Sequence, residues 1–286
     1  MTATTVPQPS VVSLPATRSA RLTFGGVVRS EWIKALSLRS IRWSVIVSIG
    51  LGVAMSAAIA FALNAMAADA PAESHVGFLT TVTSFPAGFL SLVFGVLGVF
   101  LFSSEYASGM ILSTLTSAPR RGLVFAAKAV VLTVLSVFVA VVVLASGIGA
   151  SAIVLPASTG SILDPQALTG FLGTLVFLLV VALFAFAAAG ILRSTAGGIT
   201  VMVAVVFLLP TILQIVTQVS DWSWAPVMLN YLPSTLGTVV GAGVVEGGMG
   251  SDLGMPGYGT ALVALAAWAL IPMGAAAWLF SSRDAK

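Results

Sequence analysis

Six long apolar runs constrain the fold of this chain more than any other feature of its sequence. A helix needs about 20 mostly apolar residues to cross a hydrocarbon core about 30 Å thick. Continuous apolar runs favour helices, because membrane-spanning strands would alternate apolar and polar residues. We therefore predict an all-α integral membrane protein with a single transmembrane domain over 26–286. The predicted spans lie near 44–66, 85–103, 129–153, 168–192, 198–219 and 260–281.

The basic residues predict which ends of these spans face the same side of the membrane. With six spans, all 12 Lys and Arg residues fall on one side: Arg18, Arg21, Arg29, Lys34, Arg39, Arg42, Arg120, Arg121, Lys128, Arg193, Arg283 and Lys286. Short loops rich in Lys and Arg stay in the cytoplasm. We therefore predict a multi-pass plasma-membrane protein with both termini cytoplasmic. The charged residues of the opposite side are all acidic: Asp69, Glu73, Asp164, Asp221, Glu246 and Asp252.

Composition narrows the classes of function. The chain is 58% hydrophobic and 7% charged, and its net charge of +3 comes from residues that flank the membrane, so lipid headgroups are the expected partner and nucleic acid is not. It contains no Cys, which excludes disulfides and thiol nucleophiles. Residues 1–25 have no apolar run of the roughly 7–15 residues that a signal peptide needs, and we expect them to form a disordered cytoplasmic tail.

No pattern typical of an enzyme or of a nucleotide site occurs in the sequence. The single histidine, His75, lies near Asp69 and Glu73, but zinc sites need three or four convergent ligands, so a solvated loop histidine is favoured. No acid lies near the middle of a span, and no GxxxxGK[ST] loop is present. We predict that the chain has no catalytic, cofactor or metal site of its own. A sodium site built from backbone carbonyls remains an alternative.

The segment before the last span has two interpretations. An apolar run from Val227 to Val245 is interrupted by Asn230 and Pro233, among other residues. If it were a seventh span, the two basic residues at the C-terminus would move to the acidic side. We favour a re-entrant or interfacial hairpin, which needs protein or a water-filled cavity around its irregular backbone.

A helix over 28–36 is predicted immediately before the first span. At helical spacing, apolar residues share one face and polar residues lie largely opposite: Val28, Trp32, Ala35 and Leu36 against Ser30, Glu31, Lys34 and Ser37. Such a helix can lie in the headgroup plane. A membrane anchor and a partner-binding helix are both consistent with it.

The loop after the second span, 103–121, forms a second cytoplasmic element. Glu105 lies at the C-terminal end of that span, where a carboxylate opposes the helix dipole, so we expect it to cap or pair elsewhere. Gly109 permits a backbone bend, and the run Met110–Leu115 can form a short helix before the pair Arg120 and Arg121. An ordinary basic loop and a docking surface for a cytoplasmic partner both fit this pattern.

Lys128 follows this loop and lies just inside an apolar stretch that begins at Leu123. The long aliphatic stem of a lysine can extend along apolar surface while its ammonium stays in water. We therefore expect Lys128 to reach toward the cytoplasmic headgroups.

In this order, the two elements resemble the membrane subunits of ATP-binding-cassette transporters of the type-2 exporter class. The resemblance is to compact bacterial permeases that lack an ATPase domain. In topology it covers nearly the whole chain, but in residues it is confined to about 20–128. The residues that carry it are Arg-Ser-Glu-Trp-x-Lys at 29–34, Ser-Glu-Tyr-x-x-Gly at 104–109, Pro-Arg-Arg-Gly at 119–122 and Ala-Ala-Lys at 126–128.

The resemblance implies an architecture and a set of partners. It implies an amphipathic interfacial helix before span 1, a cytoplasmic coupling helix between spans 2 and 3, and a re-entrant external segment before span 6. Two permease chains, with a homodimer favoured over a heterodimer, would join two separate ATPase subunits that hold the ATP and Mg. The residues implied to couple to the ATPase are Trp32, Lys34, Glu105, Tyr106, Gly109, Arg120 and Arg121.

The expected function is therefore that of a permease subunit that forms the substrate pathway of an ATP-driven exporter. Because the spans carry few fixed charges, we expect an amphipathic or lipid-like substrate, but no substrate-contacting residue can be identified from the sequence. A non-transporting membrane scaffold and an ion-coupled secondary transporter are the alternatives.

Overall fold

The computed structural model describes residues 23–67, 71, 74–107, 121–245 and 254–282. Within these ranges the chain forms helices joined by turns, with no strand. Among the described residues, 6 helical segments are long and apolar enough to cross a membrane. The predicted all-helical, multi-pass membrane fold is thus confirmed at this level. The long segments are α2 (Arg39–Ala67), α3 (His75–Ala107), α5 (Arg121–Val154), α6 (Pro165–Leu192), α7 to α8 (Thr195–Val219) and α11 (Tyr258–Ser282).

The helices are longer than the apolar runs that predicted them. The first begins at Arg39 rather than near 44, and the second begins at His75 rather than near 85. Hydropathy locates only the part of a helix that lies in hydrocarbon, whereas the backbone continues to form hydrogen bonds into the headgroup layer. The predicted tail over 1–25 is also too long by two residues, since α1 begins at Phe24 with Thr23 as its N-cap; residues 1–22 lie outside the described ranges.

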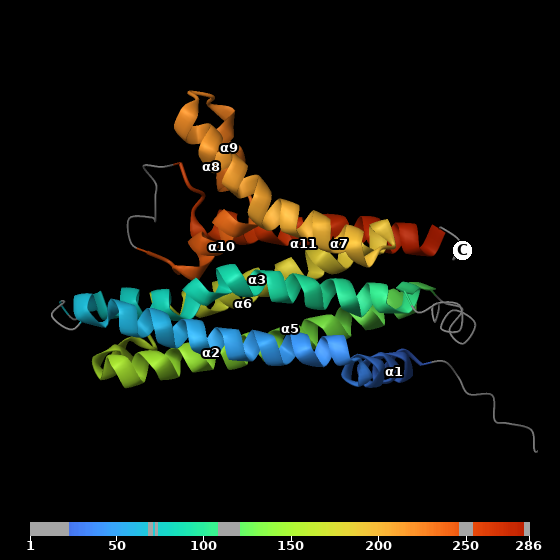
Figure 1. Cartoon of the computed structure of the whole chain (residues 1–286), viewed down its shortest axis with the longest axis horizontal. Coiled ribbons are helices and arrows are strands. Elements are labelled where there is room, and N and C mark those ends of the chain that lie inside the picture. Colours follow the sequence, from blue (N-terminus) through green and yellow to red (C-terminus); the bar gives the residue numbers. More distant parts are fainter. Residues whose placement is uncertain (1–22, 68–70, 72–73, 108–120, 246–253, 283–286) are drawn as a thin grey trace, which may run out of the picture.

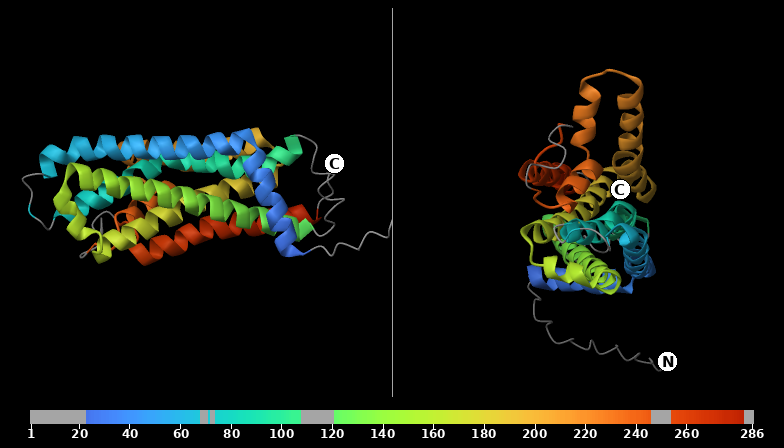
Figure 2. Two further views of the ribbon diagram at one scale, coloured as in Figure 1. Left: turned by 90° about the horizontal axis from the view of Figure 1, so that it is seen from below. Right: turned by 90° about the vertical axis from the view of Figure 1, so that its left-hand side faces the viewer.

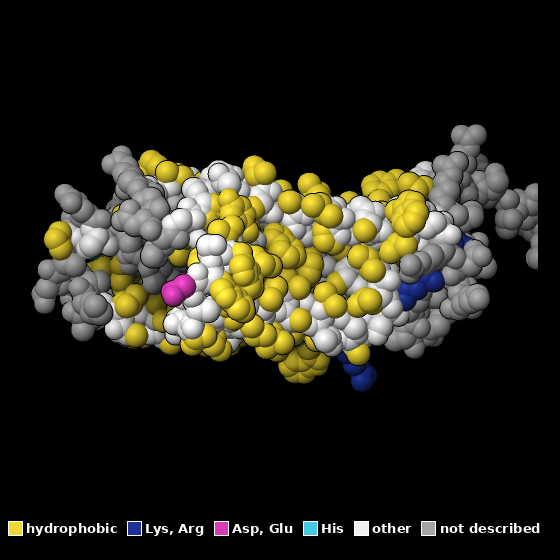
Figure 3. Space-filling model, turned by 90° about the horizontal axis from the view of Figure 1, so that it is seen from above, with side chains coloured by type: hydrophobic (Ala, Val, Ile, Leu, Met, Phe, Trp, Pro, Cys, Tyr) yellow, Lys and Arg dark blue, Asp and Glu magenta, His cyan; other side chains and the backbone are white. Residues whose placement is uncertain are grey.

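Helix α1 (Phe24–Ser37) lies across one end of the bundle (Figure 2, left). The C-terminal end of α11 lies at the same end (Figure 1). We call this the α1 end and the opposite one the far end. On the face drawn in Figure 3, Lys and Arg side chains occur only toward the α1 end, an acidic side chain lies toward the other, and hydrophobic side chains cover much of the middle. This arrangement agrees with the predicted separation of charge.

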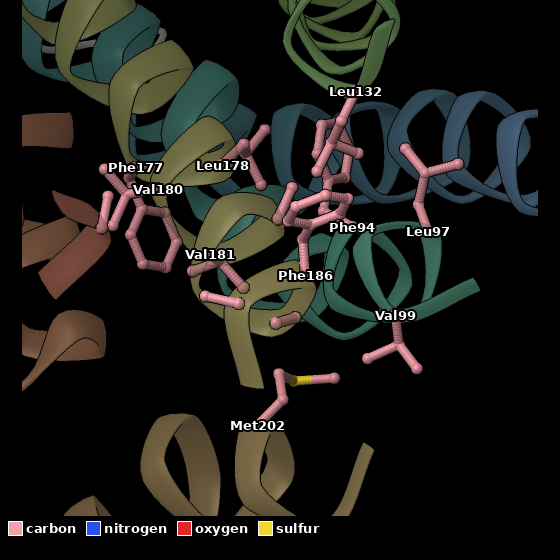
Figure 4. Packing of buried hydrophobic residues seen from close by; sticks show 14 of the residues in the cluster. Phe94, Leu97, Val99, Leu132, Phe177, Leu178, Val180, Val181, Phe186 and Met202 are labelled. Carbon is pink, nitrogen blue, oxygen red and sulfur yellow. The ribbon is translucent and has the colours of Figure 1, made fainter. Parts of the chain in front are cut away.

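Helix α6 forms the centre of the bundle and packs against α3, α11 and α5 (Figures 1 and 4). Its buried side chains meet Phe94 of α3, Leu132 of α5 and Met202 of α7 in one hydrophobic core. Small residues set the spacing, because a Cβ at Gly98 of α3 would overlap the carbonyl oxygen of Ala182 in α6. Such close approach is how helices gain packing energy where the surrounding lipid is as apolar as their side chains.

The fifth span is bent. It consists of α7 (Thr195–Val203), a π-helical turn at Ala204–Leu208 that we call η3, and α8 (Leu209–Val219). A π turn and the missing backbone N–H of Pro210 both disturb the regular hydrogen bonding of a helix. Beyond them, α8 diverges from the bundle together with α9 (Trp224–Asn230) (Figure 1; Figure 2, right).

The segment from Val227 to Val245 forms the end of α9, then α10 (Pro233–Gly241), and then a turn, and neither helix is long enough to span a membrane. The indole of Trp268 in α11 donates to the carbonyl of Tyr231 at 2.9 Å, in the turn between α9 and α10. Trp268 lies ten residues into α11, or about 15 Å from its first residue at 1.5 Å per residue. The turn therefore lies beside α11 rather than beyond its end, and a protein donor satisfies the Tyr231 carbonyl, although the Tyr231 side chain is exposed.

Candidate functional site

The α1 end contains a buried cluster of charged side chains. Glu31 of α1 is 4% exposed and Lys128 of α5 is 3% exposed. The Lys128 Nζ atom lies 2.7 Å from Oε2 of Glu31, and the Nζ atom of Lys34 lies 2.8 Å from Oε1 of the same carboxylate. One carboxylate thus accepts a charge-assisted hydrogen bond from each of two lysines, which are the stronger kind of hydrogen bond. The cluster fastens α1 to the first turns of α5.

Two sequence-based expectations are wrong at this cluster. The Lys128 ammonium does not stay in water, because it is buried against Glu31 of α1. Glu31 does not lie on the polar outer face of α1: it is buried together with Val27 and Ala35, while Leu36 is exposed. An ammonium that leaves water needs an opposite charge, so α1 is rotated to bring its carboxylate to α5. A lysine inside an apolar run was the sequence signal for such a partner.

The predicted coupling residues are only partly described. Trp32 packs against the main hydrophobic core, Lys34 belongs to the charged cluster, and Arg121 is the first residue of α5. Helices α1 and α5 pack against each other, so these three residues lie on adjoining elements. Glu105 and Tyr106 fall in the last turn of α3, but their side chains, and all of Gly109, Arg120 and the predicted coupling helix, lie outside the described residues.

An aromatic cluster joins four helices near the same end. Phe102 of α3 lies 5.1 Å from Phe186 of α6 and 5.7 Å from Phe280 of α11, measured between ring centroids. Phe125 of α5 completes the cluster at 5.3 Å from Phe186. These pairs meet edge to face, an arrangement that contributes about 0.5–1.5 kcal/mol per pair beyond the area buried. Helix α5, which carries Lys128 of the charged cluster, is therefore held firmly to the rest of the bundle.

A cavity of about 600 Å³ lies between α3, α6, η3 with α8, and α10, in the half of the bundle toward the far end. It exists because α8 diverges after the π turn, so that its first turns stand away from α3. Its wall toward the middle of the bundle includes Phe89, Phe177 and Phe207, together with Ser91. Its wall toward the far end carries hydroxyl and amide side chains, and no charged residue is among the described residues that line it.

Helix α10 closes one side of this cavity and is tied to α6. A Cβ at Gly237 would meet the ring of Phe177, and one at Gly173 would overlap the carbonyl oxygen of Val240. The turn after α10 is held by Gln166, whose side-chain amide donates to the carbonyl of Ala242 at 3.2 Å. Gly243 adopts φ +79, a conformation that glycine accepts without strain. Gly237 and Gly241 have a spacing that permits close helix approach, but the sequence does not show which helix would approach them.

Neither metal-binding residues nor comparison with known proteins assigns a function to this chain. In the part of the chain that the structure describes, no group of three or more His, Cys, Asp or Glu side chains could hold a metal ion. His75 is the first residue of α3, and its neighbours Asp69 and Glu73 lie outside the described ranges.

A scan against models of known protein families finds no match for this chain, and a search of curated proteins finds none either.

Proposed function

We propose that this chain is the membrane-spanning permease subunit of an ATP-driven exporter, with its ATPase in separate subunits. The observation that carries the proposal is the buried Glu31–Lys128 pair at 2.7 Å. It joins the two segments that hold the family-like residues, the helix with Arg29–Lys34 and the start of α5. Helix α3 ends and α5 begins at this end, and the sequence that would supply the coupling helix, 108–120, connects them.

In this proposal α1 is the amphipathic interfacial helix. It lies across the bundle axis, as a helix in the headgroup plane would (Figure 2). Its exposed face includes Ile33 and Leu36, which would contact the acyl boundary beside the exposed Arg29. The α1 end is then cytoplasmic, with both termini, by the rule that short basic loops stay inside.

The segment α9–α10 would be the re-entrant external element. The carbonyl of Tyr231 in its turn accepts a hydrogen bond from Trp268 of α11, so protein satisfies this backbone group, as irregular structure at membrane depth requires. The element closes the cavity on one side, so the cavity would form part of the substrate pathway. Two such chains would assemble as a homodimer with two ATPase subunits.

ATP binding would draw the two ATPase subunits together and move the coupling segments. The Glu31 cluster and the aromatic cluster would pass that movement from α5 to the bundle as one rigid body. Coupling of this kind is a free-energy difference shared between two sites, about 1–3 kcal/mol in ordinary allostery. ATP hydrolysis can drive it further.

The direct test is affinity purification of the chain from its native membrane in mild detergent, followed by mass spectrometry and an ATPase assay. We expect a stoichiometric P-loop ATPase to copurify. If the chain purifies alone, the exporter is rejected in favour of a scaffold or a secondary transporter.

Variants in the coupling segment provide a second test. Glu105→Ala and Gly109→Pro are expected to leave membrane insertion intact while lowering ATPase stimulation, because both alter the segment that would contact the ATPase. Gly149→Ala is the matched control, since Gly149 lies toward the far end and a Cβ there meets nothing within 4 Å. Stimulation equal to wild type in both coupling variants would reject the coupling role.

A further inference from the structure

We infer that the cavity between α3, α6, η3–α8 and α10 is a binding site for an uncharged amphipathic molecule. The molecule would carry a hydroxyl- or amide-bearing head at the far end and a hydrocarbon or aromatic tail toward the middle of the bundle. That this molecule is cargo rests on the proposed function. Its binding to the chain does not require the ATPase.

The lack of charge on the walls selects against ions. The described residues that line the cavity include no Asp, Glu, Lys, Arg or His. An ionised ligand would lose hydration on entry and find no opposite charge there, which is costly in a low-dielectric site. A neutral ligand loses much less hydration free energy on entering the cavity. The cavity walls therefore favour neutral ligands over charged ones.

The far end of the cavity offers unused hydrogen-bonding groups. Thr81, Ser84 and Gln214 line it, and their side chains form no hydrogen bond to another described residue. Hydroxyl groups both donate and accept, and a glutamine amide does the same through its nitrogen and oxygen. Their natural complement is a head that also donates and accepts, such as an alcohol, a sugar or an amide.

The other end of the cavity suits an apolar tail. Phe85 and Phe89 of α3 are 45% and 48% exposed, and they line the cavity together with Phe177 and Phe207. The volume of about 600 Å³ falls within the range of roughly 300–1,000 Å³ typical of small-molecule sites. The cavity thus offers aromatic surface to an apolar tail and hydroxyl and amide groups to a polar head.

Binding can be measured on the purified chain in phosphatidylcholine nanodiscs. Because the protein has 0 Cys, a single Thr211→Cys at the cavity wall can carry an environment-sensitive fluorophore without background labelling. The probes are 1-monolauroylglycerol and two charged molecules with the same tail, dodecylsulfonate and dodecyltrimethylammonium. We expect a saturable response to the neutral probe and at least tenfold weaker binding of both charged ones. Native mass spectrometry of the unlabelled chain repeats the measurement without any substitution.

Three variants locate the response. Gly88 lines the cavity, and a Cβ there meets nothing within 4 Å, so Gly88→Leu should fill the space without disturbing the helix and abolish saturable binding. Gly149→Leu, equally unhindered but outside the cavity, should bind like wild type. The double variant Ser84→Ala, Gln214→Leu should weaken binding of the glycerol probe about tenfold, the effect of a lost net hydrogen bond.

Three results would overturn the inference: a response that never saturates, equal affinity for neutral and charged probes, or unchanged binding by Gly88→Leu. Failure of the exporter proposal would give a different combination of binding and copurification results. Saturable binding by a chain that copurifies with no ATPase would support the site and reject the exporter. A copurifying ATPase with no saturable binding would reject the site alone.

Discussion

Replacing Glu31 by alanine is expected to lower the free energy of unfolding by about 3–5 kcal/mol, the usual cost of removing one partner from a buried ion pair. The substitution takes away the carboxylate that both Lys34 and Lys128 contact, at 2.8 and 2.7 Å. Lys128 then stays buried without that opposite charge. The measurement is the midpoint of thermal unfolding in detergent, followed by size-exclusion chromatography. We expect α1 to detach before the rest of the bundle unfolds.

The neighbouring lysines provide graded controls. Lys128→Ala should cost less than Glu31→Ala, because Glu31 keeps its contact with Lys34. Lys34→Met should cost least, since that side chain is 32% exposed and its charge is partly hydrated. The double variant Glu31→Met, Lys128→Met removes both buried charges and should recover most of the loss. Equal midpoints for Glu31→Ala and Lys34→Met would contradict the central role of the Glu31 carboxylate.

Gly98→Ala is expected to destabilise the protein by about 1–3 kcal/mol or more, the range for overpacking a core. The added methyl group would overlap the carbonyl oxygen of Ala182, so α3 and α6 must separate along the most extensive helix contact in the described structure. A backbone atom cannot move aside by changing a rotamer, which is why one methyl group has a large effect. The unfolding midpoint should fall accordingly.

Gly50→Ala is the matched control for this prediction. It adds the same methyl group to a membrane-spanning helix, α2, at a place where a Cβ meets nothing within 4 Å. No loss is expected there, since alanine also favours helix by up to about 1 kcal/mol relative to glycine. If Gly98→Ala and Gly50→Ala unfold at the same temperature, the close approach of α3 and α6 does not limit stability.

Much of the architecture could be predicted because lipid acts on each segment separately. Long apolar runs become helices wherever they occur, and α6 and α7 must run antiparallel because only Arg193 and Ser194 join them. Residue contacts are harder to predict. The sequence drew attention to Trp32 and Lys34, which lie on α1 beside the charged cluster, yet it placed Glu31 on the wrong face of its helix. Helical periodicity alone cannot show which face of α1 meets α5.

The sequence by itself determined the six membrane-spanning segments, the end where the basic residues gather, and the absence of thiol chemistry. These follow from composition and local pattern, which need no knowledge of neighbours. Only the tertiary structure decided that Glu31 pairs with Lys128, 97 residues away, and that the divergence of α8 opens a neutral cavity beside α10. Both depend on how separate helices pack, since the free energy of a buried charge or an empty space is set by the surfaces around it.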